Sequence, residues 1–439
     1  MMIFRLIWFI PCVFFSFSYS YSQSWPQWRG ADASGRAFDG NYPIKWSLKK
    51  NLLWSTKLPG RGHSSVVHES GLVWTTSALE TEASEKERKE RLKNNEGQPS
   101  VTVLSKVSLR ALRLDPHTGK IIHNIEVIQK KYPQWVHKLN SYASPTPVID
   151  DGRVYFHFGA YGNACLNAKT GKIIWKNNQK KLWVMHENGP GSSPLLWKNL
   201  MIFHLDGSDR QSIVALYKDS GVIAWQTVRS GELRENPQLR KSYSTPILET
   251  INGKSLLISC SADWVYGYDP KNGQELWKIK YGILGFSNVA RPVVGLGMFY
   301  ISTCFSKGEI HAYRFDGSNK PSLVWKITKG APKIPSPILV GKQLYIISDG
   351  GILSCVNAIT GSIYWRERLA GEFSASPTFA NGLLYFSNQQ GKTTVIKPGM
   401  KFEIVAENTL DGTPHMSSIT PFENSFLLRS SQALYRIGR

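Results

Sequence analysis

The segment ACLNAKTGKIIWK, residues 164–176, has a form that recurs along the chain. A β-rich run leads into a polar turn that ends in glycine, and a tryptophan follows four residues after that glycine. Similar segments are VALYKDSGVIAWQ (214–226), YGYDPKNGQELWK (266–278) and SCVNAITGSIYWR (354–366). A polar glycine turn between two apolar runs is typical of a β-hairpin. The repeat therefore predicts a series of hairpins with one tryptophan each.

A second repeated feature precedes each hairpin. A small residue and a proline open a strand, and a turn and an alternating apolar strand follow. The prolines are Pro145, Pro194, Pro246, Pro292, Pro337 and Pro377. A period of about 40 to 50 residues with four strands is typical of a propeller blade.

Counting the periods predicts an all-β fold, an eight-bladed β-propeller of four-stranded antiparallel blades. The C-terminal segment MSSITPFENSFLLRSSQALYRIG supplies only three strands, and NLLWSTKL (51–58) supplies the outer strand that this blade lacks. Pairing the two closes the ring, so that no sheet is left with an open end. Residues 51–439 are then one propeller, with a charged insertion at 80–100 in the first blade.

One large, flat side chain on each outer strand can fill the wedge between neighbouring sheets. We expect this structural role for Trp54, Trp175, Trp225, Trp277, Trp325 and Trp365. The segment 110–124 keeps the turn but has His123 where the tryptophan is expected.

The N-terminus predicts export. One early positive charge at Arg5, an apolar run to about Phe17 and small polar residues after it are typical of a secretory signal peptide, here residues 1–22 with cleavage before Gln23. The apolar run is short for a bilayer span. Residues 23–50 form an entry segment, and we expect a periplasmic or extracellular monomer with no transmembrane segment.

The formal net charge is +21, and +20 without Arg5. This charge favours acidic partners such as an anionic polysaccharide or an acidic protein surface of the envelope. The basic residues are scattered rather than grouped with aromatics on one element, which argues against nucleic acid. Removal of the signal leaves Cys165, Cys260, Cys304 and Cys355. Their places in strands of different repeats favour buried free thiols, and one or two disulfides of an oxidising compartment are the alternative.

The blade motif, matched best by AKTGKIIW and AITGSIYW, resembles the pyrroloquinoline-quinone (PQQ)-like propeller repeat. The chain resembles the secreted PQQ-like repeat proteins related to the outer-membrane assembly factor BamB. The resemblance includes the entry segment WPQWRGADASGRA (25–37) and PGRGHSS (59–65). It implies a propeller fold and a BamB-like binding role in the envelope.

In each blade, with strands a to d from the axis outward, the d-to-a links and b-to-c loops share one face. The turns on the other face are ordinary glycine turns, whereas histidines, carboxylates, amides and aromatics concentrate on the first face, which predicts a binding rim. The candidate binding residues are His137, Asn140, Tyr142, His186, Glu187, Asn188, Asp206, Asp209, Arg210, Asp263, Trp264, Asn288, Arg291, Lys333 and Asp349. The insertion lies on the same face, and its charges predict a solvated helix or loop, or alternatively a lid.

The chemistry of this rim is open to more than one interpretation. His157 and His204 lie at equivalent positions of adjacent blades, and His137 and His186 lie in the two preceding links. With Glu187, Asp206 and Asp209 they could supply metal ligands, but no His-x-x-x-His or His-Glu-x-x-His motif places two ligands on one element. We therefore predict no metal and no catalytic residue. A nucleophile motif Gly-x-Ser-x-Gly is absent from the sequence.

The first hypothesis is a binding propeller that holds a protein segment or an anionic glycan on its rim, without a cofactor. The alternative is an enzyme, either a quinone-dependent oxidoreductase with PQQ and calcium or a protein acting on polysaccharide. Quinoprotein dehydrogenases share this repeat but carry an adjacent cysteine pair beneath the cofactor, which this sequence lacks.

Overall fold

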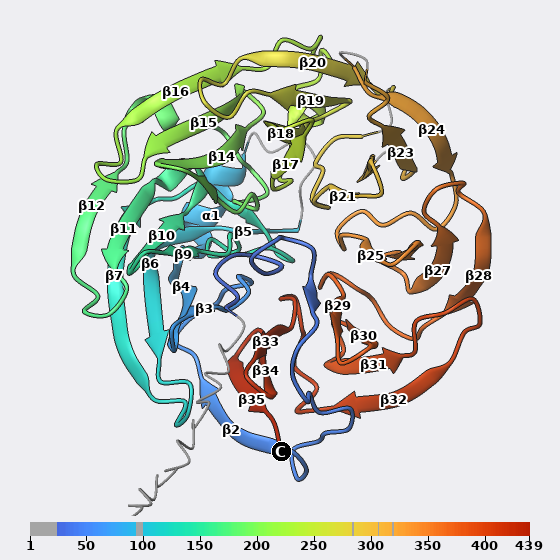
Figure 1. Cartoon of the computed structure of the whole chain (residues 1–439). Helices are drawn as coiled ribbons and strands as arrows, with labels where there is room; N and C mark the ends of the chain where they lie inside the picture. The colour runs from blue at the N-terminus through green and yellow to red at the C-terminus, as the bar shows by residue number, and fades with distance from the viewer. Residues whose placement is uncertain (1–23, 94–99, 283–284, 306, 318–319) are drawn as a thin grey trace, which may run out of the picture.

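The computed structural model describes residues 24–93, 100–282, 285–305, 307–317 and 320–439. Its four-stranded sheets are arranged radially around a central axis, like the blades of a propeller (Figure 1). The eight-bladed antiparallel fold predicted from the repeat is confirmed. The predicted signal peptide, residues 1–22, lies outside the described residues.

The first four blades follow one another in chain order. Blade 1 has strands β3 (Val67–Glu69), β4 (Leu72–Glu82), β6 (Leu104–Leu114) and β7 (Ile121–Lys131). Blade 2 has β9 (Val148–Asp150), β10 (Arg153–His157), β11 (Asn163–Asn167) and β12 (Ile173–Asn177). Blade 3 has β13 (Leu195–Trp197), β14 (Leu200–Asp206), β15 (Gln211–Tyr217) and β16 (Ile223–Val228). Blade 4 has β17 (Ile247–Ile251), β18 (Lys254–Cys260), β19 (Trp264–Tyr268) and β20 (Glu275–Lys280).

The remaining blades complete the ring. Blade 5 has β21 (Val293–Gly295), β22 (Met298–Ser302), β23 (Ile310–Arg314) and β24 (Ser322–Ile327). Blade 6 has β25 (Ile338–Val340), β26 (Gln343–Ile347), β27 (Ile352–Asn357) and β28 (Ile363–Arg368). Blade 7 has β29 (Thr378–Ala380), β30 (Leu383–Ser387), β31 (Lys392–Ile396) and β32 (Ile404–Thr409). Blade 8 has β33 (Thr420–Phe422), β34 (Ser425–Arg429), β35 (Ala433–Ile437) and, as its outer strand, β2 (Leu52–Lys57).

The ring closes as the sequence predicts, because β2 pairs antiparallel with β35 of the last blade. This pairing joins the two ends of the propeller, so neither blade 1 nor blade 8 ends the ring at an unpaired sheet. The strand-opening proline of blade 2 is Pro147 rather than Pro145, since Pro147 directly precedes β9 as Pro194 precedes β13. The predicted strand start is wrong by two residues, because Pro145 and Pro147 both follow a small residue and so both match the motif.

Each outer-strand indole packs against the next blade. Trp175 donates its Nε1 hydrogen to the Lys218 carbonyl at 2.7 Å, and a Cβ built on Gly221 would lie 2.4 Å from its ring. Gly221 has φ +68°, so this turn needs glycine both for its conformation and for its close approach to the indole. The same Nε1-to-carbonyl bond holds Trp54, Trp225, Trp325 and Trp365. The tryptophan therefore fixes the c-to-d turn of the following blade.

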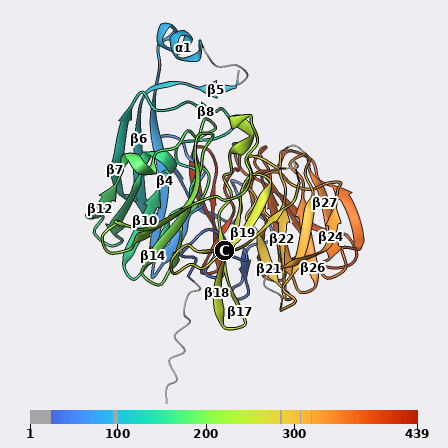
Figure 2. The ribbon, with the colours of Figure 1, turned by 90° about the horizontal axis from the view of Figure 1, so that it is seen from above.

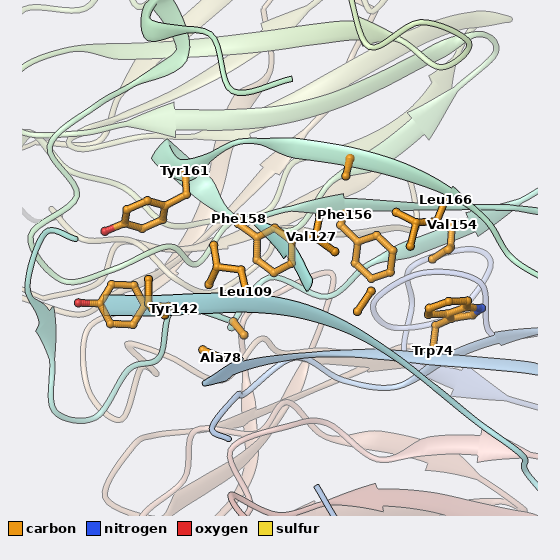
Figure 3. Packing of buried hydrophobic residues seen from close by; sticks show 14 of the residues in the cluster. Trp74, Ala78, Leu109, Val127, Tyr142, Val154, Phe156, Phe158, Tyr161 and Leu166 are labelled. Atoms are coloured by element: carbon orange, nitrogen blue, oxygen red, sulfur yellow. The ribbon is translucent and has the colours of Figure 1, made fainter. Parts of the chain in front are cut away.

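The core lies between blades rather than in one central mass. Between blades 1 and 2, Trp74 of β4, Leu109 of β6 and Phe156 of β10 are fully buried in one cluster (Figure 3). Trp74 also stacks on His123 at 6.1 Å between ring centroids, and its Nε1 bonds the Ala168 carbonyl. His123 replaces the outer-strand tryptophan of blade 1 and is smaller than it. Trp74 therefore helps to fill the wedge between blades 1 and 2.

The entry segment crosses the centre of the ring on the side of the a-to-b turns (Figure 1). Trp25 exchanges backbone hydrogen bonds with His68 of blade 1, and Ile149 of blade 2 donates to the Pro26 carbonyl. The strand β1 (Arg36–Ala37) then adds in parallel to the inner strand β29 of blade 7. The segment thereby crosses the axial channel at this end, from blades 1 and 2 to blade 7.

The insertion of blade 1 stands out from the opposite face (Figure 2). It carries the helix α1 (Glu85–Leu92), which buries no residue, as expected of a solvated helix. Below the helix, β5 (Val101–Thr102) pairs with β8 (Val136–His137) of the link to blade 2. Short 3₁₀ helices lie at Gly159–Tyr161, Lys180–Leu182 and Pro237–Arg240. Among the described residues, no helix is long and apolar enough to cross a bilayer.

Candidate functional site

A ring of hydroxyl groups surrounds the axial channel. The residue two positions before each inner strand is serine or threonine in seven blades. Its backbone N–H donates to the hydroxyl of the equivalent residue in the next blade, as from Ser65 to Thr146 and from Thr146 to Ser193, each at 2.9 Å. The same bond recurs at four further junctions. The serines that open the strands therefore join neighbouring blades, which accounts for their repetition.

Arg291 occupies this position in blade 5 and has no hydroxyl to continue the ring. Its buried guanidinium donates instead to the Pro246 carbonyl at 3.1 Å and to the Trp28 carbonyl at 3.0 Å. Burial and the nearby Arg29 lower the pKa of Arg291 to about 9, which leaves it charged at neutral pH. Arg291 thus holds the entry segment in the channel, whereas the sequence suggested a place on the binding rim.

Trp28 forms part of the wall of an axial cavity of about 450 Å³. The entry segment crosses the other end of the channel (Figure 1), and the d-to-a links surround the cavity at the mouth. The residues around it are Trp28, His63, Ser65, His137, Leu139, Asn140, Ser144, Thr146, Asn188, Gly191, Ser193, Tyr243, Phe286, Ser287, Val289, Phe305, Ile334, Ser374, Ser376, Met416, Ser417 and Ser418. All eight d-to-a links contribute to this lining, and the volume is in the range of small-ligand sites.

The cavity is electrically neutral although the chain is strongly basic. None of the described lining residues is Asp, Glu, Lys or Arg. Removal from bulk water, together with Arg61 and Arg429, lowers the pKa of His63 to about 3, and burial also lowers the pKa of His137. Both imidazoles are therefore uncharged at neutral pH. The arrangement can accept an apolar or aromatic group and offers hydroxyls and amides for hydrogen bonds.

The structure brings three of the fifteen candidate rim residues to this cavity, namely His137, Asn140 and Asn188. The Asn140 amide donates to the backbone carbonyl of Asn188 at 2.7 Å, so these two residues join adjacent links at the mouth. Tyr142, His186 and Asn288 are buried beneath the rim.

Most of the charged candidates are held by partners of this chain. Asp206 forms a fully buried ion pair with Arg229, Glu187 pairs with Lys241, and Asp263 pairs with Arg234. Asp209 accepts the Met185 N–H, Arg210 donates to the Trp183 carbonyl, and Asp349 accepts the Lys333 N–H. Trp264 donates to the Glu232 carbonyl. Intramolecular partners thus occupy these groups and shape the links around the mouth.

The histidines considered as metal ligands have separate partners. His157 bonds Asn163 at 2.7 Å, His186 accepts the Ala160 N–H at 3.1 Å, and His204 bonds Ser259 at 2.7 Å. In the described part of the chain, no group of three or more His, Cys, Asp or Glu residues could hold a metal ion. Cys165, Cys260, Cys304 and Cys355 are buried free thiols.

Backbone strain marks the links near the mouth. Non-glycine residues with positive φ include Glu187 at +56°, Asp263 at +61°, Ser287 at +53° and Cys304 at +74°. They lie in the d-to-a links and b-to-c loops of blades 3 to 5 rather than in regular a-to-b turns. Such conformations persist where the surrounding structure enforces them and are common at binding sites.

Sequence reasoning missed the apolar part of the cavity. Trp28 lies in the entry segment and Leu139 in an irregular link, so neither follows the repeat, and Phe286, Phe305 and Met416 carry no repeated signal either. The ring of hydroxyls could have been predicted from the sequence, since a serine or threonine precedes the strand-opening proline in most of the blades that have this proline.

The described residues form an eight-bladed propeller with an axial cavity lined by the d-to-a links. The chain belongs to the family described as outer membrane protein assembly factor BamB, which matches residues 110–304 and 306–399. BamB of Yersinia pestis is 23% identical over 221 residues, 46% of this chain, and the match spans about half (52%) of that relative.

Solved structures are similar in fold at low identity. BamB from Moraxella catarrhalis has a TM-score of 0.57 at 13% identity, over 88% of this chain and 97% of its own. A europium-containing methanol dehydrogenase has a TM-score of 0.51 at 12% identity, over 94% and 89% of the two chains. At these identities the likeness concerns the propeller fold alone.

Proposed function

We propose that this protein is an exported binding propeller of the cell envelope that captures a segment of a partner protein at its axial cavity. The observation that carries the proposal is the convergence of all eight d-to-a links on a neutral, mainly apolar cavity to which the entry segment contributes Trp28. Membership of the BamB family supports an envelope role, and the predicted signal peptide supports export.

An uncharged side chain of the partner fits the lining best. Leu139, Phe286, Val289 and Phe305 offer apolar surface, and burying such surface favours binding by about 25 cal/mol per Å². The hydroxyls and the Asn140 amide satisfy peptide groups that enter with the side chain. An anionic glycan would meet no positive charge among the described residues inside the cavity.

The lining does not fit PQQ with calcium. PQQ carries three carboxylates, which need basic donors, and calcium needs carboxylate or carbonyl oxygens. The described lining contains no basic side chain and no carboxylate, and the carbonyl oxygen of the Asn140 amide already accepts from Ser141 and Ser144. Glycoside hydrolysis also needs a pair of carboxylates, so the same lining gives no support to a polysaccharide-cleaving enzyme.

A cavity-filling variant tests the proposal. Val289→Trp places a large side chain in the cavity, and Val222→Trp places the same side chain on an exposed turn of the opposite face. We expect Val289→Trp, but not Val222→Trp, to abolish binding of the uncharged fluorophore N-phenyl-1-naphthylamine.

Crosslinking in cells tests the nature of the partner. A photoreactive p-benzoylphenylalanine at position 139, at the mouth, should give one discrete adduct with an envelope protein, and the adduct should disappear in the Val289→Trp background. The same residue at position 222 should give none. Equal adducts at both positions, or no adduct at position 139, would overturn the proposal.

A further inference from the structure

Two links beside the mouth form a continuous shelf, which we define as residues 131–140 and 180–188. Gln134 joins them, because its amide donates to the Val184 carbonyl at 2.8 Å and accepts the His186 N–H at 2.9 Å. The Asn140 amide adds bonds to the carbonyls of Asn188 and Pro190. The shelf reaches the cavity directly, since Leu139 and Asn188 line it.

The shelf is basic. Lys131, Lys138, Lys180 and Lys181 are exposed, and within the described ranges no hydrogen bond or ion pair holds their ammonium groups. The single carboxylate within the shelf is Glu187, which pairs with Lys241 at 2.9 Å. Asp209 contacts the shelf at the Met185 N–H, and the charge of Arg210, which donates to the Trp183 carbonyl, offsets it. The shelf therefore presents four uncompensated positive charges beside a neutral cavity.

The same shelf exposes apolar side chains. Tyr132 is 65% exposed, Leu139 58%, and Trp183 and Met185 38% each. Exposed aromatic and aliphatic side chains next to a cavity are typical of a protein interface. Leu139 and Met185 give an anionic sugar polymer no hydrogen-bonding group, so their presence favours a polypeptide.

We infer that the shelf binds an acidic segment of the partner protein, with carboxylates against the four lysines and an apolar side chain in the axial cavity. This inference rests on the proposed function, because it names the chemical class of the segment that the cavity captures. Charges at a rim mainly govern association and specificity, so the acidity of the segment selects the partner while the cavity holds it.

Binding of three end-blocked fluorescent peptides, measured by fluorescence anisotropy, tests the inference. All three have Trp-Leu at the centre and differ in the charge of the flanking residues. They are the acidic Glu-Asp-Glu-Trp-Leu-Glu-Asp-Glu, the neutral Ser-Asn-Ser-Trp-Leu-Ser-Asn-Ser and the basic Lys-Arg-Lys-Trp-Leu-Lys-Arg-Lys. We expect the acidic peptide to bind at least about tenfold more tightly than the neutral one at 50 mM NaCl, and the preference to shrink at 500 mM NaCl because salt screens exposed charges. The basic peptide should bind least.

Charge-reversal variants locate the effect. Changing the four shelf lysines together to glutamate should remove the preference for the acidic peptide and leave neutral binding intact. The matched control changes Lys120, Lys169, Lys172 and Lys271 to glutamate, which alters the net charge equally but on the exposed c-to-d turns of the opposite face, and should keep the preference.

The outcomes separate the two proposals. Equal binding of acidic and neutral peptides, lost in Val289→Trp, would overturn the shelf and support the cavity. Equal effects of the two charge-reversal variants would also overturn the shelf, because the preference would then follow net charge alone. Binding of polygalacturonate with no binding of any peptide would overturn both proposals.

Discussion

Replacing Arg229 with methionine tests whether Asp206 serves the scaffold rather than a ligand. The Arg229 guanidinium contacts the Asp206 carboxylate through Nε at 3.1 Å and Nη2 at 2.9 Å, and both side chains are almost fully buried. Nη1 donates to Ser259 at 2.6 Å. Burial opposes the charge of Arg229, but Asp206 and Tyr268 outweigh this effect and hold its pKa above the ordinary value.

Removing one partner of such a pair leaves an uncompensated buried charge, which costs about 3–5 kcal/mol of folding free energy. We therefore expect this loss for Arg229→Met. The double variant Asp206→Asn/Arg229→Met removes the stranded charge as well, so it should be more stable than Arg229→Met alone. The control is Lys280→Met, which breaks the Lys280–Glu232 pair at 2.9 Å, whose side chains are 44% and 79% exposed. An exposed pair contributes about 0–1 kcal/mol.

Urea unfolding, followed by tryptophan fluorescence and circular dichroism, measures these differences. A rescue of Arg229→Met by Asp206→Asn is the decisive result, because it reports the coupling of the two groups rather than the loss of one long side chain. If Arg229→Met unfolds at the same urea concentration as Lys280→Met, the reasoning is wrong. It is also wrong if the double variant is less stable than Arg229→Met.

Two further predictions concern acid stability and the entry segment. Burial lowers the pKa of His68, His157 and His415 to about 4, so the folded state favours their neutral form. Their contribution to the free energy of unfolding is complete above the unfolded pKa of about 6.5. As the pH decreases from there toward 4, the free energy of unfolding falls by up to about 1.4 kcal/mol per histidine and pH unit. The melting temperature should decrease steeply from pH 7 to pH 5, and a constant value would contradict this. Arg291→Met should speed tryptic cleavage after the buried Arg29 by about tenfold or more, because the guanidinium bond to the Trp28 carbonyl of the entry segment is lost. Mass spectrometry of the fragments measures the rate, and equal cleavage of both proteins would show that Arg291 does not hold the segment.

The repeat predicted the fold because its signals are local. A glycine turn and a tryptophan four residues later, as at Gly221 and Trp225, recur wherever the same hairpin recurs. The closure of blade 8 by residues 51–58 followed from counting strands, since a ring leaves one outer strand to be supplied. Even the misplaced Pro145 changed only the start of one strand.

The site was harder to predict, because pairing between distant residues decides it. Asp206, Glu187 and Asp263 look available in the sequence, but Arg229, Lys241 and Arg234 neutralise them in the fold. Arg291 is buried against the entry segment, more than 250 residues away in the chain. No local pattern carries such contacts.

The sequence by itself determined the blades, their number and the face on which the irregular links gather, because periodic side chains set strands and turns within about 50 residues. Only the tertiary structure decided which of those links are free to bind. It brought Trp28 of the entry segment into the wall of the channel and left a neutral cavity beside four lysines that have no partner among the described residues. The physical reason is that burial and charge pairing depend on neighbours supplied by other blades, and the ring places those neighbours only when it closes.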